Sequence, residues 1–284
     1  MDSVKIKKLA LELALRAGEI QKSKFRTRLS ISWKGATDPV TEVDRACEAL
    51  IVKGIRRAFP DHAIVGEEGG AQGRDAANAP FTWFIDPLDG TVNYSHGLPQ
   101  FAVSIGVWQR GLKTPKTRLQ DSVFGAPVVG LVHAPLLKET YSAERGKGAF
   151  LNGQRLVVST QAKPMQAVLA SGFSYTSHAT GENTREWMEV LRRFQAIRRM
   201  GSAALDLCFT AAGRFDAFWE YGLKSWDVAA AGLALEEAGG TITNIAGSPY
   251  VLGKPGIVAS NRRLHKPLLA CLKRALARPL RWTV

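Results

Sequence analysis

Two carboxylates stand three residues apart where an apolar run of the chain ends. The run Trp83–Ile85 has strand character and is followed at once by Asp86 and Asp89. Pro87 fixes its own φ angle and Gly90 tolerates unusual angles, so we predict a rigid, tight turn. Oxygen ligands without a neighbouring His or Cys suit Mg²⁺ or Mn²⁺ better than Zn²⁺. The alternative is an Asx-type turn that merely ends the strand.

Further acidic residues stand at the ends of other predicted elements. Glu67 and Glu68 follow the short apolar run 63–65 and are flanked by glycines, which makes them a second candidate ligand cluster or a surface turn. Asp227 opens a predicted helix, where an acid is also favoured by the helix dipole alone. Asp44 follows Thr41 by three residues, the spacing of a capping box.

Hydrophobic periodicity and breaker residues divide the rest of the chain into helices and strands. We predict helices over 3–24, 41–58, 183–194, 202–212, 225–237 and 262–275. We predict strands over 63–65, 83–85, 101–107, 128–133, 137–143, 167–171, 196–200, 215–219, 241–243 and 256–259. Residues 33–39 and 71–80 are expected to be loops, and 111–127 an unusually long polar connection. Strands dominate before residue 160 and alternate with helices after it.

Composition limits the cellular context. The chain has 284 residues, of which 45% are hydrophobic, enough for one large domain with a substantial core. No apolar run approaches the ~20 residues of a membrane span, and the N-terminus lacks a signal-peptide pattern. Three widely spaced cysteines, Cys47, Cys208 and Cys271, indicate reduced core thiols. We therefore expect a cytoplasmic protein without membrane association.

The charge balance is strongly basic. The formal net charge is +13, and residues 262–284 hold seven Lys or Arg and no acid. A solvated basic face explains this as readily as attraction to an acidic substrate or a nucleic acid. No RNA- or DNA-binding motif accompanies the charge. If the basic C-terminal helix binds RNA, neutralising Arg274, Arg278 and Arg281 is expected to abolish a salt-sensitive association.

Taken together, the acidic motifs resemble those of the inositol monophosphatase family, the lithium-sensitive, Mg²⁺-dependent phosphomonoesterases. The resemblance rests on Glu67 after one strand, Asp86-Pro87-Leu88-Asp89-Gly90-Thr91 after the next, and Trp226-Asp227-Val228-Ala229-Ala230-Ala231-Gly232 at a helix start. Residues 41–44 and 236–240 extend it, and it covers roughly residues 5–275. It implies a layered α-β-α-β-α sandwich of mixed α/β class, of the inositol monophosphatase and fructose-1,6-bisphosphatase type. We expect one domain over 1–284, with lobes at about 1–160 and 161–284.

The resemblance also assigns metal ligands. Glu67, Asp86 and the Leu88 carbonyl are expected to hold a first Mg²⁺. Asp86, Asp89 and Asp227 are expected to hold a second, and Glu67 contributes to a third, weaker ion, with Mn²⁺ as an alternative metal.

Catalytic and substrate roles follow from the same resemblance. Thr91, braced by Asp44, is expected to orient the attacking water, Glu67 to act beside the metals, and Lys34 to lie near them on a loop. Substrate contacts are expected at Asp89, Gly90, Thr91, Gly201, Ser202, Ala203 and Glu220. From the residues alone, Ser202 could be only a helix cap, Glu220 a surface acid and Lys34 a solvated lysine.

These residues predict an enzyme. A phosphate monoester carries about two negative charges, so catalysis depends on positioning and charge neutralisation, which two metal ions can supply. We predict Mg²⁺-dependent hydrolysis of a sugar or cyclitol phosphate, foremost inositol 1-phosphate. The resemblance alone implies a homodimer. Alternatives are fructose 1,6-bisphosphate, histidinol phosphate or a 3′,5′-bisphosphate nucleotide as substrate. An alternative of another class is a binding protein associated with RNA or the transcription machinery.

Overall fold

The structure is a computed structural model and describes residues 2–112 and 117–277 of the chain. Its helices are α1 (Asp2–Lys24), α2 (Glu42–Ala58), α3 (Thr91–Ser95), α4 (Ser177–Thr180), α5 (Thr184–Leu191), α6 (Ala203–Ala211), α7 (Ser225–Ala229), α8 (Ala231–Glu237) and α9 (His265–Ala277), with a 3₁₀ turn at Pro164–Gln166. Its first strands are β1 (Ile31–Trp33), β2 (Pro39–Thr41), β3 (Ala63–Gly66), β4 (Gly70–Gly73), β5 (Phe81–Asp89), β6 (Ala102–Gln109), β7 (Leu119–Gln120), β8 (Ala126–Ala134) and β9 (Glu139–Glu144). The remaining strands are β10 (Gly148–Leu151), β11 (Gln154–Arg155), β12 (Val168–Ser171), β13 (Ala196–Arg198), β14 (Ala217–Glu220), β15 (Thr241–Asn244), β16 (Tyr250–Val251) and β17 (Ile257–Ser260).

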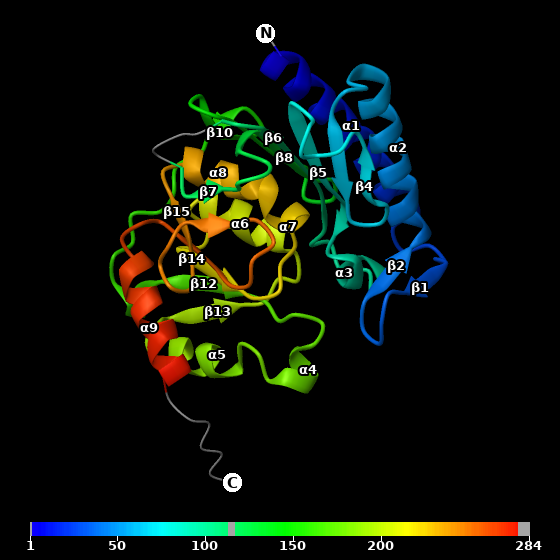
Figure 1. Ribbon diagram of the computed structural model, residues 1–284. Helices are drawn as coiled ribbons and strands as arrows, with labels where there is room; N and C mark the ends of the chain where they lie inside the picture. Colours follow the sequence, from blue (N-terminus) through cyan, green and yellow to red (C-terminus); the bar gives the residue numbers. More distant parts are fainter. Residues whose placement is uncertain (1, 113–116, 278–284) are drawn as a thin grey trace.

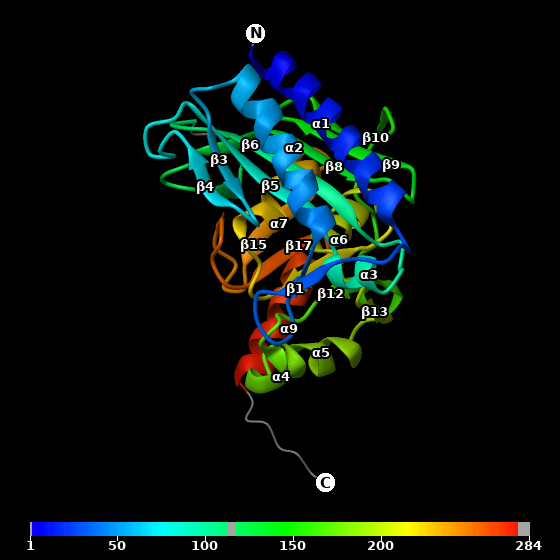
Figure 2. The same cartoon turned by 90° about the vertical axis from the view of Figure 1, so that its right-hand side faces the viewer.

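Helices and sheets alternate in layers, which confirms the predicted fold class (Figures 1 and 2). α1 and α2 cover one face of an eight-stranded mixed sheet of order β11-β10-β9-β8-β6-β5-β3-β4. α6, α7 and α8 pack against its other face and separate it from a five-stranded sheet of order β13-β12-β14-β17-β15. α5 and α9 pack against each other beyond the second sheet. The lobe boundary near residue 160 stays a prediction.

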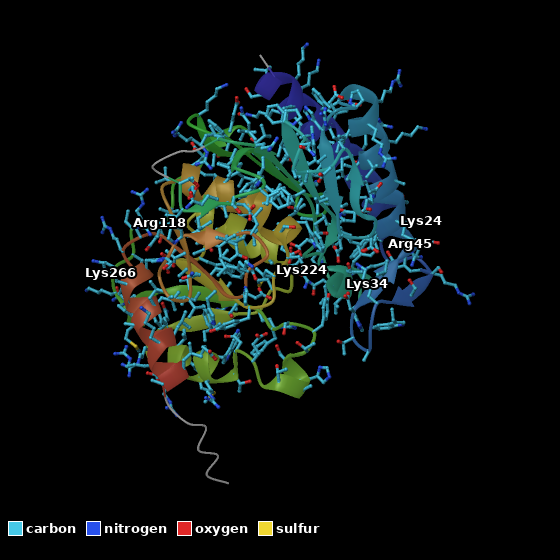
Figure 3. The ribbon with its side chains drawn as sticks, viewed as in Figure 1. Lys24, Lys34, Arg45, Arg118, Lys224 and Lys266 are labelled. Carbon is cyan, nitrogen blue, oxygen red and sulfur yellow. The ribbon has the colours of Figure 1, made fainter. Side chains whose placement is uncertain are left out.

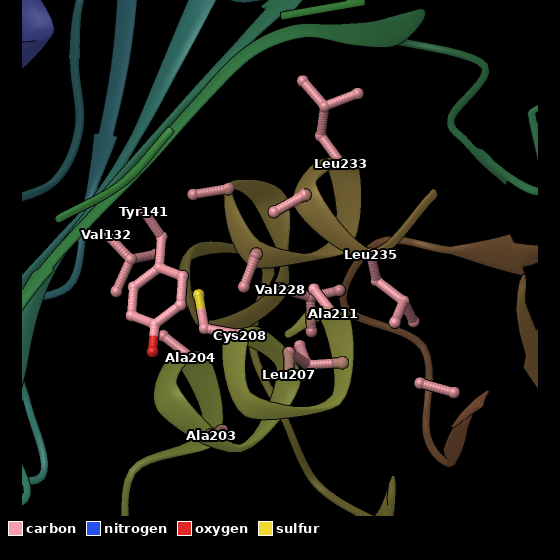
Figure 4. Close-up of a cluster of buried hydrophobic side chains, with 14 of the residues drawn as sticks. Val132, Tyr141, Ala203, Ala204, Leu207, Cys208, Ala211, Val228, Leu233 and Leu235 are labelled. Carbon is pink, nitrogen blue, oxygen red and sulfur yellow. The ribbon is translucent and has the colours of Figure 1, made fainter. Parts of the chain in front are cut away.

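The middle helical layer carries much of the apolar core. Val132 and Tyr141 of the large sheet face Ala204 and Cys208 of α6 (Figure 4). Small side chains along α6 and α8 let these helices approach each other closely, and every residue of α6 is buried. The cysteines Cys47, Cys208 and Cys271 are buried free thiols, as predicted. None of the described helices is long and apolar enough to cross a lipid bilayer.

The predicted tight turn at Asp86 is wrong in its form. β5 continues to Asp89 and forms a bulge, because Asp86 pairs with Ser104 while Asp89 pairs with Ala102 on β6. Pro87 lacks the N–H that a regular ladder needs, which favours such an irregularity. The chain then turns at Gly90, whose φ is 94°, into α3. The bulge holds both carboxylates on one short, irregular stretch of buried strand.

Several predicted loops contain short strands. Residues 33–39 belong to the β1–β2 hairpin, and 71–80 begin with β4, an edge strand beside β3. The polar connection 111–127 contributes β7, which pairs with β16. These strands are only two to four residues long, so periodicity does not reveal them.

One predicted helix is divided in the structure. The helix expected over 225–237 breaks at Ala230 into α7 and α8. At this point the helical backbone lies against the large sheet: a side chain on Gly130 would begin 2.3 Å from the Ala230 carbonyl oxygen. Because Gly130 has no side chain, the helix can approach the sheet this closely, which brings the first turn of α7 towards the end of β5.

Candidate functional site

A cavity of about 410 Å³ lies where the end of β5 meets the first turns of α6 and α7. It is lined by residues from both halves of the chain. Of the residues predicted from the sequence, the lining includes Lys34, Glu67, Asp86, Leu88, Asp89, Gly90, Thr91, Gly201, Ser202, Ala203, Glu220 and Asp227. Asp44 is outside the lining and contacts it through a hydrogen bond.

Strand pairing brings Glu67, at the end of β3, beside the β5 strand that carries Asp86 and Asp89. β3 and β5 run parallel with Gly66 beside Ile85, and the N–H of Glu67 donates to the Ile85 carbonyl at 3.1 Å. Glu67 therefore lies beside Asp86, which is 2% exposed. Asp227 comes from the first turn of α7, in contact distance of the same sheet.

Each aspartate in this group accepts hydrogen bonds from the protein. Asp86 Oδ1 accepts from the Leu88 N–H at 3.0 Å. Asp89 Oδ2 accepts from the Ser202 hydroxyl at 2.6 Å and from the Ala204 N–H at 2.7 Å. Asp227 Oδ2 accepts from the Lys224 N–H at 2.7 Å. These bonds fix the carboxylates at the cavity wall.

Burial raises the pKa values of all four acids, and repulsion by neighbouring acids of the group raises those of Asp86 and Asp227 further. Burial raises the pKa of Glu67 to about 7 and that of Asp89 to about 6. The pKa of Asp86 is raised well above its usual range by burial, and further by Glu67, Asp89 and Asp227. Burial, Asp89 and Glu67 likewise raise the pKa of Asp227. A group of acids that oppose one another's ionisation is a site that a cation would stabilise.

The donor chemistry of the cavity fits a hard divalent cation. Carboxylate and carbonyl oxygens line it, and neither His nor Cys does. Among the described residues, no three His, Cys, Asp or Glu side chains stand in an arrangement that already surrounds a metal ion. The hydrogen bonds to Leu88, Ser202, Ala204 and Lys224 instead engage the aspartate oxygens. Glu67, Asp86, Asp89 and Asp227 would have to turn some of these oxygens towards a bound ion.

Thr91 and Asp44 form the predicted pair. The Thr91 hydroxyl lies 2.9 Å from Asp44 Oδ1 and 2.9 Å from the Leu88 carbonyl oxygen. Asp44 Oδ2 accepts from the Thr41 N–H at 2.9 Å, which closes the predicted capping box at the start of α2. Asp44 thus both caps a helix and holds the Thr91 hydroxyl.

Lys34 lies on the β1–β2 hairpin and reaches the acids. Its Nζ is 3.1 Å from Glu67 Oε1 and 2.6 Å from Glu68 Oε1. Burial lowers the pKa of Lys34, but Glu67 and Glu68 outweigh burial and raise it above its usual value. Lys34 is therefore an ion-paired cavity residue and is not a freely solvated loop lysine.

The stretch predicted to meet the alcohol portion lines the same cavity. Ser202 stands at the N-cap position of α6, but its side chain makes no capping bond and donates to Asp89 instead. The interpretation of Ser202 as only a cap is therefore wrong. Glu220, at the end of β14, is partly buried and lines the cavity, and burial raises its pKa to about 8.

Sequence reasoning missed several residues of the cavity wall. Phe173 and Tyr175 lie on the loop after β12, and Arg199 precedes Gly201. No pattern singles out these loop residues. Asp206 follows Ala203 by three residues on α6, and helical spacing could have placed both on one face.

The basic C-terminus is described only in part. Arg274 of α9 lies 3.7 Å from Glu189 of α5 and is half exposed. Arg278 and Arg281 lie outside the described residues. RNA binding by this end of the chain stays a prediction.

The fold and the cavity define a class of protein: a layered α-β-α-β-α protein with an acidic, oxygen-lined site between the end of β5 and the first turns of α6 and α7. A sequence model of the inositol monophosphatase family matches residues 2–277. The chain is 42% identical over 274 residues to Nus factor SuhB of Pseudomonas aeruginosa, covering 93% of this chain and 94% of the relative. It is 36% identical over 271 residues to inositol-1-monophosphatase of Mesorhizobium japonicum, covering 94% and 96%.

Solved structures agree. Inositol monophosphatase from Anabaena superposes with a TM-score of 0.83 at 34% identity, covering 96% of this chain and 97% of that one. The extragenic suppressor protein SuhB from Bartonella henselae gives 0.85 at 34% identity, covering 95% and 99%. This chain belongs to the inositol monophosphatase family, and it is a phosphoric monoester hydrolase.

Proposed function

We propose that the chain hydrolyses a sugar or cyclitol phosphomonoester with Mg²⁺, foremost myo-inositol 1-phosphate. The observation that carries the proposal is the convergence of Glu67, Asp86, Asp89 and Asp227 on one cavity that Glu220 also lines. The family is generally metal-dependent, and relatives named inositol-1-monophosphatase support the substrate class.

Two or three Mg²⁺ ions, or Mn²⁺ in their place, would be held by Glu67, Asp86, Asp89, Asp227 and the Leu88 carbonyl. Bound there, they would neutralise the phosphate charge and lower the pKa of a coordinated water. Lys34 would add one positive charge beside Glu67, which limits how much negative charge the cavity presents to an anionic substrate.

The chain's own groups would orient the reactants. If the Thr91 hydroxyl donates its hydrogen bond to Asp44, its oxygen can still accept a hydrogen bond from the attacking water. The backbone N–H groups of Gly90 and Thr91 are the proposed donors to the phosphate oxygens. Holding the water and the phosphorus atom in the reactive geometry lowers the entropic part of the activation barrier.

The alcohol portion would lie against Gly201, Ser202, Ala203 and Glu220. The Glu220 carboxyl group can accept hydrogen bonds from ring hydroxyls, which favours a polyol. A second phosphate at this end would face the carboxyl groups of Glu220 and Asp206, with Arg199 as the opposing cation.

A substrate panel with Mg²⁺ tests the proposal. We expect the highest kcat/KM for myo-inositol 1-phosphate among that ester, fructose 1,6-bisphosphate, histidinol phosphate and adenosine 3′,5′-bisphosphate. Equal kcat/KM for all four, or a preference for a bisphosphate, would contradict the substrate assignment. Lithium is expected to inhibit, and sedimentation is expected to show a homodimer.

We also propose, as a second function, association with RNA or the transcription machinery. The name of the Pseudomonas relative and the net charge of +13 support it. Basic side chains lie on both sides of the molecule, with Lys24 and Arg45 on one side and Arg118 and Lys266 on the other (Figure 3). These four side chains do not gather in one basic patch.

Ribosomal RNA binding measured from 50 to 200 mM salt tests this second function. We expect Asp86→Asn to retain binding and lose turnover, with affinity falling steeply as salt rises. Neutralising Arg274, Arg278 and Arg281 is expected to remove binding and retain turnover. Absence of RNA binding at 50 mM salt would reject the second function.

A further inference from the structure

Asp206 is a buried acid in the cavity wall to which the proposed function assigns no contact with the substrate. It lies in the first turns of α6, is 1% exposed, and lines the cavity. Its Oδ1 atom is buried and has no hydrogen-bond partner. Buried polar atoms in folded proteins are almost always paired, so an unpaired carboxyl oxygen beside a binding cavity indicates a missing partner.

Helix geometry directs Asp206 towards the substrate end of the cavity. Residues three apart on a helix share a face, so Asp206 lies beside Ala203, which is a proposed contact of the alcohol portion. The backbone N–H of Asp206 donates to the Ser202 carbonyl at 3.0 Å, so the helix fixes its position. The side chain therefore belongs to the wall that the alcohol portion would meet.

Glu220 is the second acid at this end. A side chain on Gly172 would begin 2.1 Å from Glu220 Oε1, so the carboxyl group fills the space beside that glycine and is held at the cavity. Burial and Glu220 raise the pKa of Asp206 well above its usual range, while Arg199 opposes the rise. Glu220 lies close enough to Asp206 to oppose its ionisation.

We propose that Asp206 binds the substrate, accepting a hydrogen bond from a hydroxyl of the alcohol portion while Glu220 accepts one from another hydroxyl. The inference rests on the proposed function and extends it: the enzyme selects esters whose alcohol carries several hydroxyls. Two acceptors side by side match a polyol and leave an unpaired acid against an aryl or alkyl ester, which disfavours those esters.

The proposal implies a conflict between stability and function at this position. An unpaired buried acid destabilises the free protein, and a purely structural residue would not be kept in that state. Replacing Asp206 is therefore expected to raise the melting temperature of the free protein and to weaken substrate selection at the same time.

Steady-state kinetics of Asp206→Ala on two esters provide the test. For myo-inositol 1-phosphate we expect KM to rise about tenfold with kcat within about threefold, the loss of one hydrogen bond to a buried acid. For p-nitrophenyl phosphate, which has no hydroxyls to bind, kcat/KM is expected to change less than about twofold. Asp206→Asn retains an acceptor oxygen and is expected to give a smaller rise in KM than Asp206→Ala.

Thr210→Val is the matched control. Thr210 is a buried polar residue one turn further along α6, bonded to the Asp206 carbonyl, and it does not line the cavity. We expect it to lower the melting temperature and leave the ratio of kcat/KM values for the two esters unchanged.

The outcomes separate the two proposals. If the wild-type protein does not prefer the cyclitol ester over p-nitrophenyl phosphate, the proposed function fails. If the wild-type protein prefers it and Asp206→Ala prefers it equally, or if both esters lose the same factor, the assignment of Asp206 is overturned.

Discussion

The Thr91 hydroxyl lies between two acceptors, Asp44 Oδ1 and the Leu88 carbonyl oxygen, at 2.9 Å from each. A hydroxyl has one hydrogen, so it can donate fully to only one of them. Donation to the Asp44 carboxyl group leaves the Leu88 carbonyl free to act as a metal ligand. The pair therefore links the cap of α2 to both the proposed water-binding atom and a proposed metal ligand.

The hydroxyl of Thr91 is expected to act in turnover. Thr91→Val keeps the shape and removes the hydroxyl, so we expect kcat to fall by about 100-fold or more, the range for a positioned proton-transfer group. Thr91→Ser keeps the hydroxyl and should retain kcat within about fivefold. Saturation kinetics on myo-inositol 1-phosphate measure both, and a Thr91→Val kcat within twofold of wild type would contradict the role.

Neutralising the acids should remove turnover without unfolding the protein. For Asp86→Asn and Asp227→Asn we expect kcat to fall by about 1000-fold or more, equivalent to about 4 kcal/mol. In chelator, neither variant should melt below wild type, because each removes a repelling charge from a buried group.

Asp216→Asn is the control for these variants. Asp216 is a buried aspartate outside the cavity lining and accepts from the Val168 N–H at 2.8 Å. It should lose stability and keep kcat, the reverse of the cavity variants. Near-normal turnover in Asp86→Asn or Asp227→Asn would show that the ligand assignment is wrong.

Divalent metal should stabilise the fold. At about 100 times the dissociation constant, binding adds about 2.7 kcal/mol, which corresponds to a rise of roughly 5–10 °C in melting temperature for a chain of this size. Differential scanning fluorimetry with Mg²⁺, Mn²⁺ and a chelator measures it. The double variant Asp86→Asn, Asp227→Asn should show no rise, and a wild-type melting temperature independent of millimolar metal would contradict metal binding.

His265 should make stability depend on pH. Its ring lies between the hydroxyls of Thr243 and Ser260, each 2.9 Å away, and burial lowers its pKa from 6.5 to about 4. His265 therefore binds a proton more readily in the unfolded chain than in the folded one. The contribution of the neutral ring to the free energy of unfolding is complete above pH 6.5 and is lost as the pH falls towards 4.

Urea unfolding at pH 7 and pH 5 tests the prediction for His265. Wild type should lose about 2 kcal/mol more between these pH values than His265→Gln. His178→Gln removes an exposed histidine and should leave the wild-type loss unchanged. An equal loss of unfolding free energy between pH 7 and pH 5 in wild type and His265→Gln would contradict the role of His265.

The sequence predicted the acids of the site better than their surroundings. Glu67, Asp86 and Asp227 could be found because each follows a strand or opens a helix in a recognisable motif. The bulge at Pro87 could not, because it depends on which residues of β6 pair with β5. The bond from Ser202 to Asp89 joins residues 113 positions apart, and no local pattern encodes it.

The fold was predicted to a similar extent. Long amphipathic helices such as α1 and α2 follow from periodicity. Short strands such as β4 and β16 do not, because two to four residues are too few to carry a periodic signal. The break at Ala230 arises from contact with the sheet at Gly130, which only the folded chain provides.

The central claim is that Glu67, Asp86, Asp89 and Asp227 bind the divalent ions that support phosphate hydrolysis. Anomalous diffraction at the manganese edge, from crystals grown with Mn²⁺, tests it most directly. The account predicts at least two manganese peaks, each with Asp86 among its ligands and one shared with Asp89 and Asp227. A cavity without manganese in crystals of an enzyme that hydrolyses the ester in the same buffer would contradict it.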